Sequence, residues 1–172
     1  MKTHILITGA SRGIGAAIAA SFNPATTKWV ALSSQDGDLH DPAVPAQLWA
    51  KALADLDGRI DVLINNAGIF EPNPVARPDD AWLDSWNRTM QVNLTASADL
   101  CRRAVLHWQE NGASGRIVNI ASRAAHRGDS PAHWHYAASK AGMAAMTKTI
   151  ARAYAKEGIY AFAICPGFTM TG

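Results

Sequence analysis

The sequence predicts an α/β protein built on a doubly wound parallel sheet. Short apolar runs alternate with segments rich in helix formers along the whole chain. The runs are apolar at successive positions, which is typical of strands that helices cover on both faces. The first run ends in a glycine-rich turn that leads directly into a helical segment. The length of 172 residues predicts one domain over residues 1–172.

The elements follow in regular order. Strands are expected at His4–Thr8, Trp29–Ser33, Asp61–Asn65, Arg116–Ala121 and Ile159–Cys165. Helices are expected at Ile14–Phe22, Pro42–Asp55, Ala81–Gln109 and Tyr136–Glu157. Asp41 is the expected N-cap of the second helix, with Pro42 at its first position, and Gly158 is expected to end the last helix in a left-handed conformation. Because parallel strands share one carboxyl edge, the loops after these strands should meet there and form the ligand site.

Composition excludes several classes of protein. The net charge is 16 − 14 = +2, which leaves no electrostatic footprint for nucleic acid. No apolar run approaches the roughly 18 residues that span a bilayer, and the N-terminus lacks the pattern of a signal peptide. Two cysteines, Cys101 and Cys165, do not make a disulfide framework, so a reducing, cytoplasmic location is expected.

The glycine-rich turn has the context of a dinucleotide-binding fingerprint. Gly9 permits a tight turn, Gly13 lets the backbone approach a pyrophosphate, and Gly15 lets the helix pack closely on the strand. The free N–H groups of the helix N-terminus attract phosphate. The spacing is G-x-x-x-G-x-G rather than G-x-G-x-x-G, and a turn without ligand would also explain these residues taken alone.

Five motifs occur together in one order: TGASRGIG from Thr8, NNAG from Asn65, VNL from Val92, YAASK from Tyr136, and PG from Pro166. In this combination the chain resembles the classical type of the short-chain dehydrogenase/reductase family. The resemblance implies that residues 1–172 form one NAD(P)-binding domain with a Rossmann fold, which also carries the catalytic residues of an NAD(P)-dependent oxidoreductase. Such an enzyme interconverts a ketone or aldehyde with an alcohol by hydride transfer. It also implies a small-molecule substrate and a homodimer or homotetramer, with no nucleic acid or membrane partner.

Tyr136 and Lys140 lie four residues apart on an expected helix, which places both side chains on one face. A phenol with a pKa of about 10 exchanges protons poorly at neutral pH, and a neighbouring ammonium lowers that pKa. Tyr136 is therefore the expected general acid and base, and Lys140 is expected to lower its pKa. Taken alone, the same spacing fits an ordinary amphipathic helix.

Two more catalytic residues are implied by the resemblance. Ser122 ends the fourth strand, and its hydroxyl would orient the reacting oxygen. Ser130, deeper in the same loop, is the alternative. Asn93 would hold a water that relays protons to Lys140, although an asparagine within a helix also fits a bend or a surface position.

The resemblance extends to the cofactor contacts. Besides Tyr136 and Lys140, the expected cofactor-binding residues are Gly9, Ser11, Arg12, Gly13, Ile14, Gly15, Ser33, Asp38, Leu39, Asn66, Ala67, Gly68, Pro166, Gly167, Thr169 and Thr171. Asp38 and Leu39 would reach the adenine. Either Thr169 or Thr171 would bond the carboxamide, and Thr171 fits the spacing better.

Charge favours NADP(H) over NAD(H). A carboxylate at the end of the second strand would bond the ribose 2′-hydroxyl and repel a 2′-phosphate. That strand instead ends in Ser33, and Arg12 provides a cation in the glycine loop. Asp36 and Asp38 are the alternative, because a shift of register would bring one of them to the ribose.

The chain departs from the family pattern at two places. The stretch from Ser34 to Asp38 is too short for the usual helix, so elements at that edge of the sheet should be reduced. Family members continue beyond the PG turn with a substrate loop and a further strand, so the sequence as given is expected to omit that part. Without it, Ile159–Cys165 should form an exposed edge strand. These departures keep a second hypothesis open, a non-catalytic dinucleotide sensor or assembly subunit.

The loop before Tyr136 carries His133 and His135, but two histidines without a clear third ligand do not predict a metal site. An apolar, aromatic wall of the substrate site is the expected use of this loop. The helix that follows is rich in alanine and methionine almost all round, which indicates burial on several sides. One side should meet the sheet and the other a partner subunit.

Overall fold

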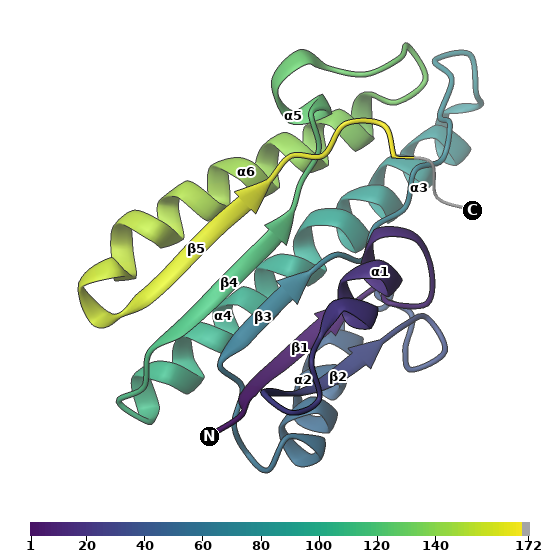
Figure 1. The fold of residues 1–172 in the computed structure, drawn as a ribbon. Helices are drawn as coiled ribbons and strands as arrows, with labels where there is room; N and C mark the ends of the chain where they lie inside the picture. The colour runs from purple at the N-terminus through teal and green to yellow at the C-terminus, as the bar shows by residue number, and fades with distance from the viewer. Residues whose placement is uncertain (170–172) are drawn as a thin grey trace.

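The chain folds around a five-stranded, all-parallel sheet in this computed structural model, which describes residues 1–169 (Figure 1). The strands are β1 (Thr3–Thr8), β2 (Thr27–Leu32), β3 (Val62–Asn65), β4 (Gly115–Ile120) and β5 (Ile159–Ile164). They lie in the order β2-β1-β3-β4-β5. The chain therefore moves outward from β1 to β2 and then returns to β3 on the other side of β1. This reversal creates a switch point between β1 and β3, where doubly wound sheets bind ligands.

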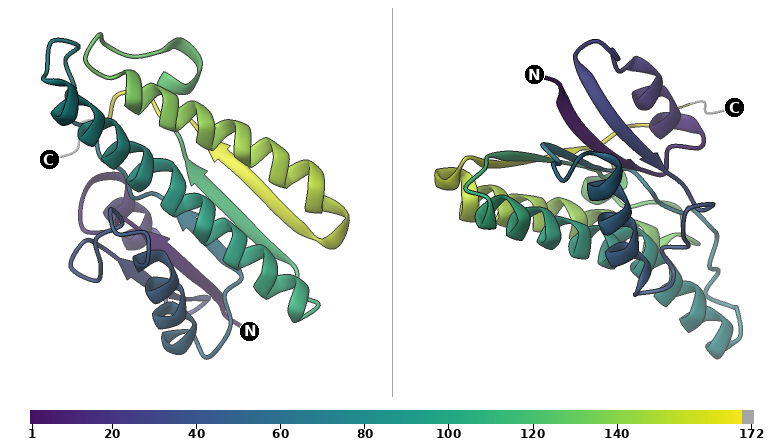
Figure 2. Two further views of the ribbon diagram at one scale, coloured as in Figure 1. Left: turned by 180° about the vertical axis from the view of Figure 1, so that it is seen from behind. Right: turned by 90° about the horizontal axis from the view of Figure 1, so that it is seen from below.

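Helices connect successive strands. They are α1 (Gly13–Ser21), α2 (Val44–Asp55), α3 (Asp79–Met90), α4 (Ala96–Glu110), α5 (Ala124–Arg127) and α6 (Trp134–Tyr154). A π-helical turn, η1 (Gln91–Thr95), joins α3 to α4, and a 3-10 turn, η2 (Ala155–Glu157), follows α6. Figure 2 shows α1 on one face of the sheet, and α2, α4 and α6 on the other. The doubly wound α/β prediction is confirmed.

The two faces of the sheet are filled unequally. The face toward α2, α4 and α6 holds the larger core, which includes Leu6, Leu63, Ile117 and Trp108, all nearly inaccessible to solvent. The face toward α1 holds a smaller core around Ile5, Ile7, Ile64 and Ile120. On this face α1 does not cover β5, where Phe162 and Ile164 are each 50% exposed. As expected, β5 is an edge strand of the sheet, with β2 at the opposite edge.

The predicted strands and long helices are present, with three differences in detail. The second helix begins at Val44, because Asp41 closes a turn of its own: its carboxylate accepts from the N–H of Ala43 at 2.8 Å. The expected N-cap at Asp41 and helix start at Pro42 were therefore wrong. The long helix expected over residues 81–109 contains a π-helical turn around Asn93. The last helix, expected to run to Glu157, ends at Tyr154, and the 3-10 turn η2 follows it. Gly158 caps η2 in the predicted left-handed conformation, with φ of 77°.

Along residues 1–169, no helix combines the length and the hydropathy that crossing a membrane requires.

Candidate active site

The turn between β1 and α1 is shaped by glycines at its closest contacts. Gly9 has a φ of +66°, and a Cβ there would lie 2.6 Å from the Cα of Ala67. A Cβ at Gly15 would overlap the carbonyl oxygen of Gly9 and the side-chain amide of Asn66. Asn66 holds the turn from the β3 side, because its Nδ2 donates to the carbonyl oxygens of Gly9 (2.8 Å) and Thr8 (3.2 Å). The backbone is thus left uncovered at the switch point, as a pyrophosphate requires.

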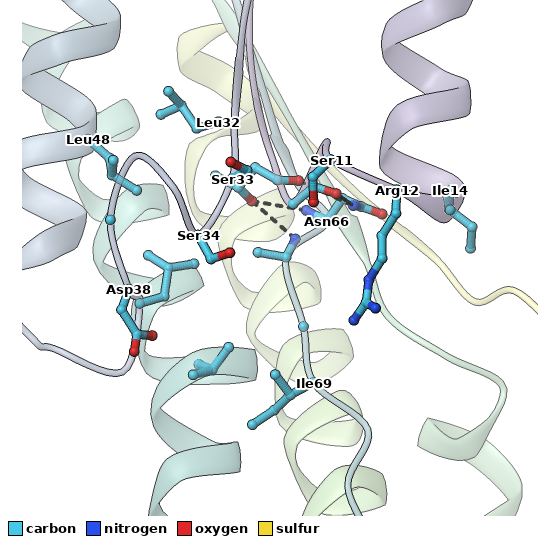
Figure 3. A pocket seen from close by; sticks show the side chains of 18 of the residues that line it. Ser11, Arg12, Ile14, Leu32, Ser33, Ser34, Asp38, Leu48, Asn66 and Ile69 are labelled. Atoms are coloured by element: carbon cyan, nitrogen blue, oxygen red, sulfur yellow. Dashed lines mark hydrogen bonds between the residues drawn. The ribbon is translucent and has the colours of Figure 1, made fainter. Parts of the chain in front are cut away.

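A cleft with a volume of about 1090 Å³ runs along this edge of the sheet (Figure 3). The expected cofactor residues that line it are Gly9, Ser11, Arg12, Gly13, Ile14, Ser33, Asp38, Leu39, Asn66, Ala67, Gly68, Tyr136 and Thr169. Gly15 acts behind the turn, through the close contact just described. Thr171 lies outside the described residues. The cleft has the shape and the backbone lining that a dinucleotide needs.

Charged side chains of both signs line this cleft: Arg12, Asp38, Glu71 and Arg88. Arg12 reaches along one side and Asp38 lies on the other, with Ser33 and Ser34 between them (Figure 3). Asp36 is absent from the lining, because its carboxylate turns back to accept from the N–H of Ser33 (2.9 Å) and from its hydroxyl (3.3 Å). Asp36 therefore places a negative charge next to Ser33 without facing the cleft itself.

A second cavity of about 190 Å³ adjoins the cleft at its inner end. Ser122, Tyr136, Lys140, Pro166 and Gly167 line it. The two cavities share several lining residues: Ile14, Asn66, Gly68, Ile69, Tyr136 and Thr169. Tyr136 thus faces both the nucleotide cleft and the smaller cavity.

Lys140 is 4% exposed and comes from the inner face of α6. Its Nζ donates to the carbonyl oxygen of Ile120 at 2.8 Å and lies 5.9 Å from the centre of the Tyr136 ring. Burial lowers the pKa of Lys140 to about 8, and the nearby Cys165 opposes this effect. A base with this pKa exchanges protons readily near neutral pH.

Burial raises the pKa of the Tyr136 phenol above its ordinary value, and the neighbouring Ser122 hydroxyl partly opposes that rise. The lowered pKa expected from Lys140 is therefore not seen. The physical reason is that Tyr136 is largely surrounded by protein, so the cost of desolvating a phenolate exceeds the attraction of an ammonium bonded elsewhere. This pKa holds Tyr136 in its protonated form, which is the form that donates a proton.

Asn93 lies in the π-helical turn and has no solvent exposure. Its Oδ1 accepts from the N–H of Ile69 (2.8 Å), and its Nδ2 donates to the carbonyl of Ile69 (3.0 Å) and to the hydroxyl of Ser139 (3.2 Å). A Cβ on Gly68 would lie 3.4 Å from both Asn93 Oδ1 and Lys140 Nζ. Asn93 and Lys140 therefore converge on Gly68, and the bend or surface position considered for Asn93 is replaced by a buried, fully bonded one.

The two candidate serines occupy different surroundings. Ser122 lines the inner cavity, and its Oγ accepts from the N–H of Ala124 at 3.1 Å. Ser130 is exposed, and its hydroxyl is paired with Nδ1 of His133 at 2.6 Å. The structure thus brings Ser122, and not Ser130, to Tyr136.

Two residues that shape the site, Phe70 and Thr8, are not among the predicted site residues, although Thr8 begins the TGASRGIG motif. Phe70 lines the inner cavity, stacks on His133 with ring centres 3.9 Å apart, and meets Tyr136 edge to face at 4.7 Å. Thr8 fixes the third-strand loop, because its Oγ1 accepts from the N–H groups of Asn66 (3.3 Å) and Ala67 (3.2 Å). Their proximity to known motifs was the only available indication.

The histidines of the loop before α6 pack with aromatic rings. His135 is buried at 1% exposure, and burial lowers its pKa. Over residues 1–169 no three potential ligands of the His, Cys, Asp or Glu type gather in a way that would hold a metal ion.

Comparison with known proteins gives a consistent result. The model of the short chain dehydrogenase family matches residues 31–172. A 3-oxoacyl-[acyl-carrier-protein] reductase of Synechocystis sp. is 36% identical over 96% of this chain and 74% of its own length. A D-beta-hydroxybutyrate dehydrogenase of Rhizobium meliloti is 34% identical over 99% of this chain and 73% of its own.

Solved structures agree with these relatives. A 4-hydroxyisoleucine dehydrogenase complexed with NADH has a TM-score of 0.87 and 31% identity, over 99% of this chain and 77% of that one. An actinorhodin polyketide ketoreductase with NADPH has a TM-score of 0.84 and 28% identity, over 99% and 72%. Fold, cleft and relatives together support a nicotinamide dinucleotide as the cofactor. On this evidence the chain belongs to the short-chain dehydrogenase/reductase family of oxidoreductases.

Proposed function

We propose that the protein is an NADP(H)-favouring oxidoreductase that interconverts a ketone or aldehyde with an alcohol. The observation that carries the proposal is the position of Tyr136, which lines both the nucleotide cleft and the inner cavity, beside Ser122 and Lys140. A proton donor at the junction of a cofactor cleft and a substrate-sized cavity is what carbonyl reduction requires. We also propose that residues 1–172 form one domain, which binds the nucleotide and carries the catalytic residues.

When bound, a nicotinamide dinucleotide supplies the hydride for reduction and accepts it in the reverse reaction. In reduction, the Tyr136 hydroxyl donates its proton to the carbonyl oxygen as the carbon receives the hydride, so the product is a neutral alcohol. Ser122, whose hydroxyl neighbours that of Tyr136, orients the same oxygen. Lys140, held on Ile120, contributes to the ribose site and to proton supply. The amide of Asn93 is occupied by Ile69 and Ser139, so Asn93 does not hold the expected relay water with its side chain and instead positions the backbone next to Gly68 and Lys140.

The preference for NADP(H) rests on Arg12. Its guanidinium is the basic group on the side of the cleft where the glycine loop lies, and Ser33 and Ser34 offer hydroxyl donors rather than carboxylates. Such a set suits a 2′-phosphate. The carboxylate of Asp36, bonded to Ser33, repels a 2′-phosphate and so reduces the expected difference in affinity between NADPH and NADH.

The substrate belongs to the small carbonyl and hydroxyl compounds. The relatives include reductases of 3-oxoacyl groups and a dehydrogenase of D-beta-hydroxybutyrate. In this chain Phe70 and the ring of Tyr136 form an aromatic wall beside the inner cavity. We infer a substrate with an apolar group next to the reacting carbon.

A homodimer or homotetramer is part of the proposal. On α6 the outward positions include Ala145 as well as Lys148 and Arg152, all exposed, so the helix is less apolar on its outer face than its composition indicated. Leu106 on the adjacent α4 is also exposed. These outer faces are the surfaces we expect a second copy to cover, in a cytoplasmic protein whose two cysteines are free.

The deciding experiment combines a binding and a turnover measurement. The purified protein is titrated with NADPH and NADH by nucleotide fluorescence. It is then assayed for oxidation of the preferred nucleotide with a panel of ketones and aldehydes. We expect tighter binding of NADPH and turnover with at least one carbonyl compound. Binding without turnover across the panel would instead support a dinucleotide sensor or assembly subunit, and binding of neither nucleotide would refute both.

A further inference from the structure

Four buried polar side chains form a continuous chain beneath the site, between the sheet and its helices. Asn65 Nδ2 donates to Asn119 Oδ1 at 2.8 Å and lies 3.3 Å from Cys101 Sγ. Asn119 Nδ2 donates to Thr147 Oγ1 at 2.8 Å. The Thr147 hydroxyl in turn donates to the carbonyl of Met143 at 2.7 Å. The chain thus links α4, β3, β4 and α6, and each member is at most 3% exposed.

These groups lie next to the larger apolar core, where aliphatic side chains of the same size would pack without polar atoms. Burial raises the pKa of the Cys101 thiol to about 12, so its S–H keeps its proton and points to Asn119 Oδ1 at 3.7 Å. A buried polar network costs free energy unless its members stay bonded, and it therefore specifies one arrangement of the elements that it joins.

The arrangement that it specifies includes Lys140. Asn119 immediately precedes Ile120, whose carbonyl accepts the hydrogen bond from Lys140 Nζ. Thr147 follows Lys140 by seven residues, which is two turns of a helix and the same face of α6. Two parallel links, Asn119 to Thr147 and Ile120 to Lys140, therefore join the same strand to the same helix.

We propose that Asn119 and Thr147 are positioning residues that fix α6 along β4 and so hold Lys140 Nζ on the Ile120 carbonyl, beside Tyr136. A shift of α6 by one residue would rotate Lys140 by about 100° away from this carbonyl. The proposal rests on the function proposed above, in which Lys140 serves the site. Its test does not require turnover, so a failure of either one can be recognised separately.

The test compares three variants at two threonines of α6. Thr147→Val keeps the shape and removes the hydroxyl, and Thr147→Ser keeps the hydroxyl. Thr149→Val is the matched control, because Thr149 is exposed and its Oγ1 also bonds the carbonyl four residues earlier, that of Ala145, at 3.3 Å. Lys140 is followed by NMR with lysine labelled at ¹³Cε, as the resonance that is lost in Lys140→Met. Tyr136 and Cys165 are the titratable groups beside it.

We expect Thr147→Val to change the titration midpoint of Lys140 by at least about half a pH unit. Thr147→Ser and Thr149→Val should reproduce the parent protein. If Thr147→Val does not fold, the pair Asn119→Leu with Thr147→Val is measured in its place, because it removes both ends of this hydrogen bond and leaves Asn65 Nδ2 its contact with Cys101 Sγ. An unchanged Lys140 titration in the folded variant, even with a lower Tm, would show a merely structural role and overturn the proposal. An equal change in Thr149→Val would overturn it as well.

Discussion

The two ends of the site are built in different ways. At the proposed nucleotide end, close contacts of Gly9 and Gly15 leave no room for a Cβ, and in our proposal peptide groups of this turn bind the cofactor. At the catalytic end, side chains from η1, the β4 loop and α6 converge, and their chemistry depends on burial. One end is therefore sensitive to any added atom, and the other to the loss of one functional group.

This difference makes binding and turnover separable. Added bulk in the glycine turn should abolish cofactor binding and everything that depends on it. Loss of the Tyr136 hydroxyl should leave binding intact, because the aromatic ring that remains still lines the cleft. Variants at each end therefore test whether cofactor binding and turnover can be lost separately.

The largest effect is expected at Tyr136. Tyr136→Phe removes the proton donor and little volume, so turnover should fall by about 10²–10⁴-fold. The Kd for NADPH should stay within about twofold of the parent value, since the cleft keeps its lining. Steady-state rates and nucleotide fluorescence measure the two quantities. A variant with the parent rate would remove Tyr136 from the mechanism.

A smaller but broader effect is expected at Gly15. Gly15→Ala places a Cβ against the Gly9 carbonyl and Asn66, so binding of NADPH should weaken by about 10²-fold, with a lower Tm. Gly112→Ala is the control: it strains a left-handed backbone (φ +58°) outside the lining of the cleft and has nothing within 4 Å of the added Cβ, so it should not change the affinity for NADPH. Fluorescence titration of both variants decides the point. Equal losses in the two would mean that close packing at Gly15 is not what shapes the turn.

Arg12 tests the polarity of the nucleotide end. Arg12→Gln should weaken NADPH binding by about tenfold and NADH binding by much less, because a charge-assisted contact to the 2′-phosphate is lost. Arg152→Gln removes the same charge from the exposed outer side of α6 and should change neither affinity. Equal weakening of both nucleotides in Arg12→Gln would transfer the choice of cofactor to other residues, with Asp36 the first to examine.

How far the sequence predicts the site also differs between the two ends. The glycine turn is a local feature, since its residues are neighbours in the chain and require only a strand before them and a helix after them. Tyr136 and Lys140 share a face for the same local reason. Phe70 could not be placed, because its contacts with His133 and Tyr136 join two separate loops. The pKa of Tyr136 was expected in the wrong direction, because burial is a property of the folded chain.

The smallest expected effect concerns the stability cost of a buried amine. The pKa of Lys140 lies at about 8 in the folded protein, below the ordinary 10.5, so folding disfavours its charged form. That cost is present in full below about pH 8, where the folded and unfolded chains both hold the proton. It is relieved as the pH rises toward 10.5, because the folded chain releases the proton first.

Lys140→Met should therefore raise the free energy of unfolding by about 1 kcal/mol at pH 7, after allowance for the lost bond to Ile120. The gain should shrink between pH 8 and pH 10, because the parent protein becomes more stable over that range while the variant does not. Urea denaturation at a series of pH values measures this, with Lys148→Met, an exposed lysine of the same helix, as the control. A Lys140→Met variant less stable than the parent at pH 7 would show that the bond to Ile120 outweighs the burial of the charge. The hydrogen bond to Ile120 would then compensate fully for the burial of the Lys140 ammonium.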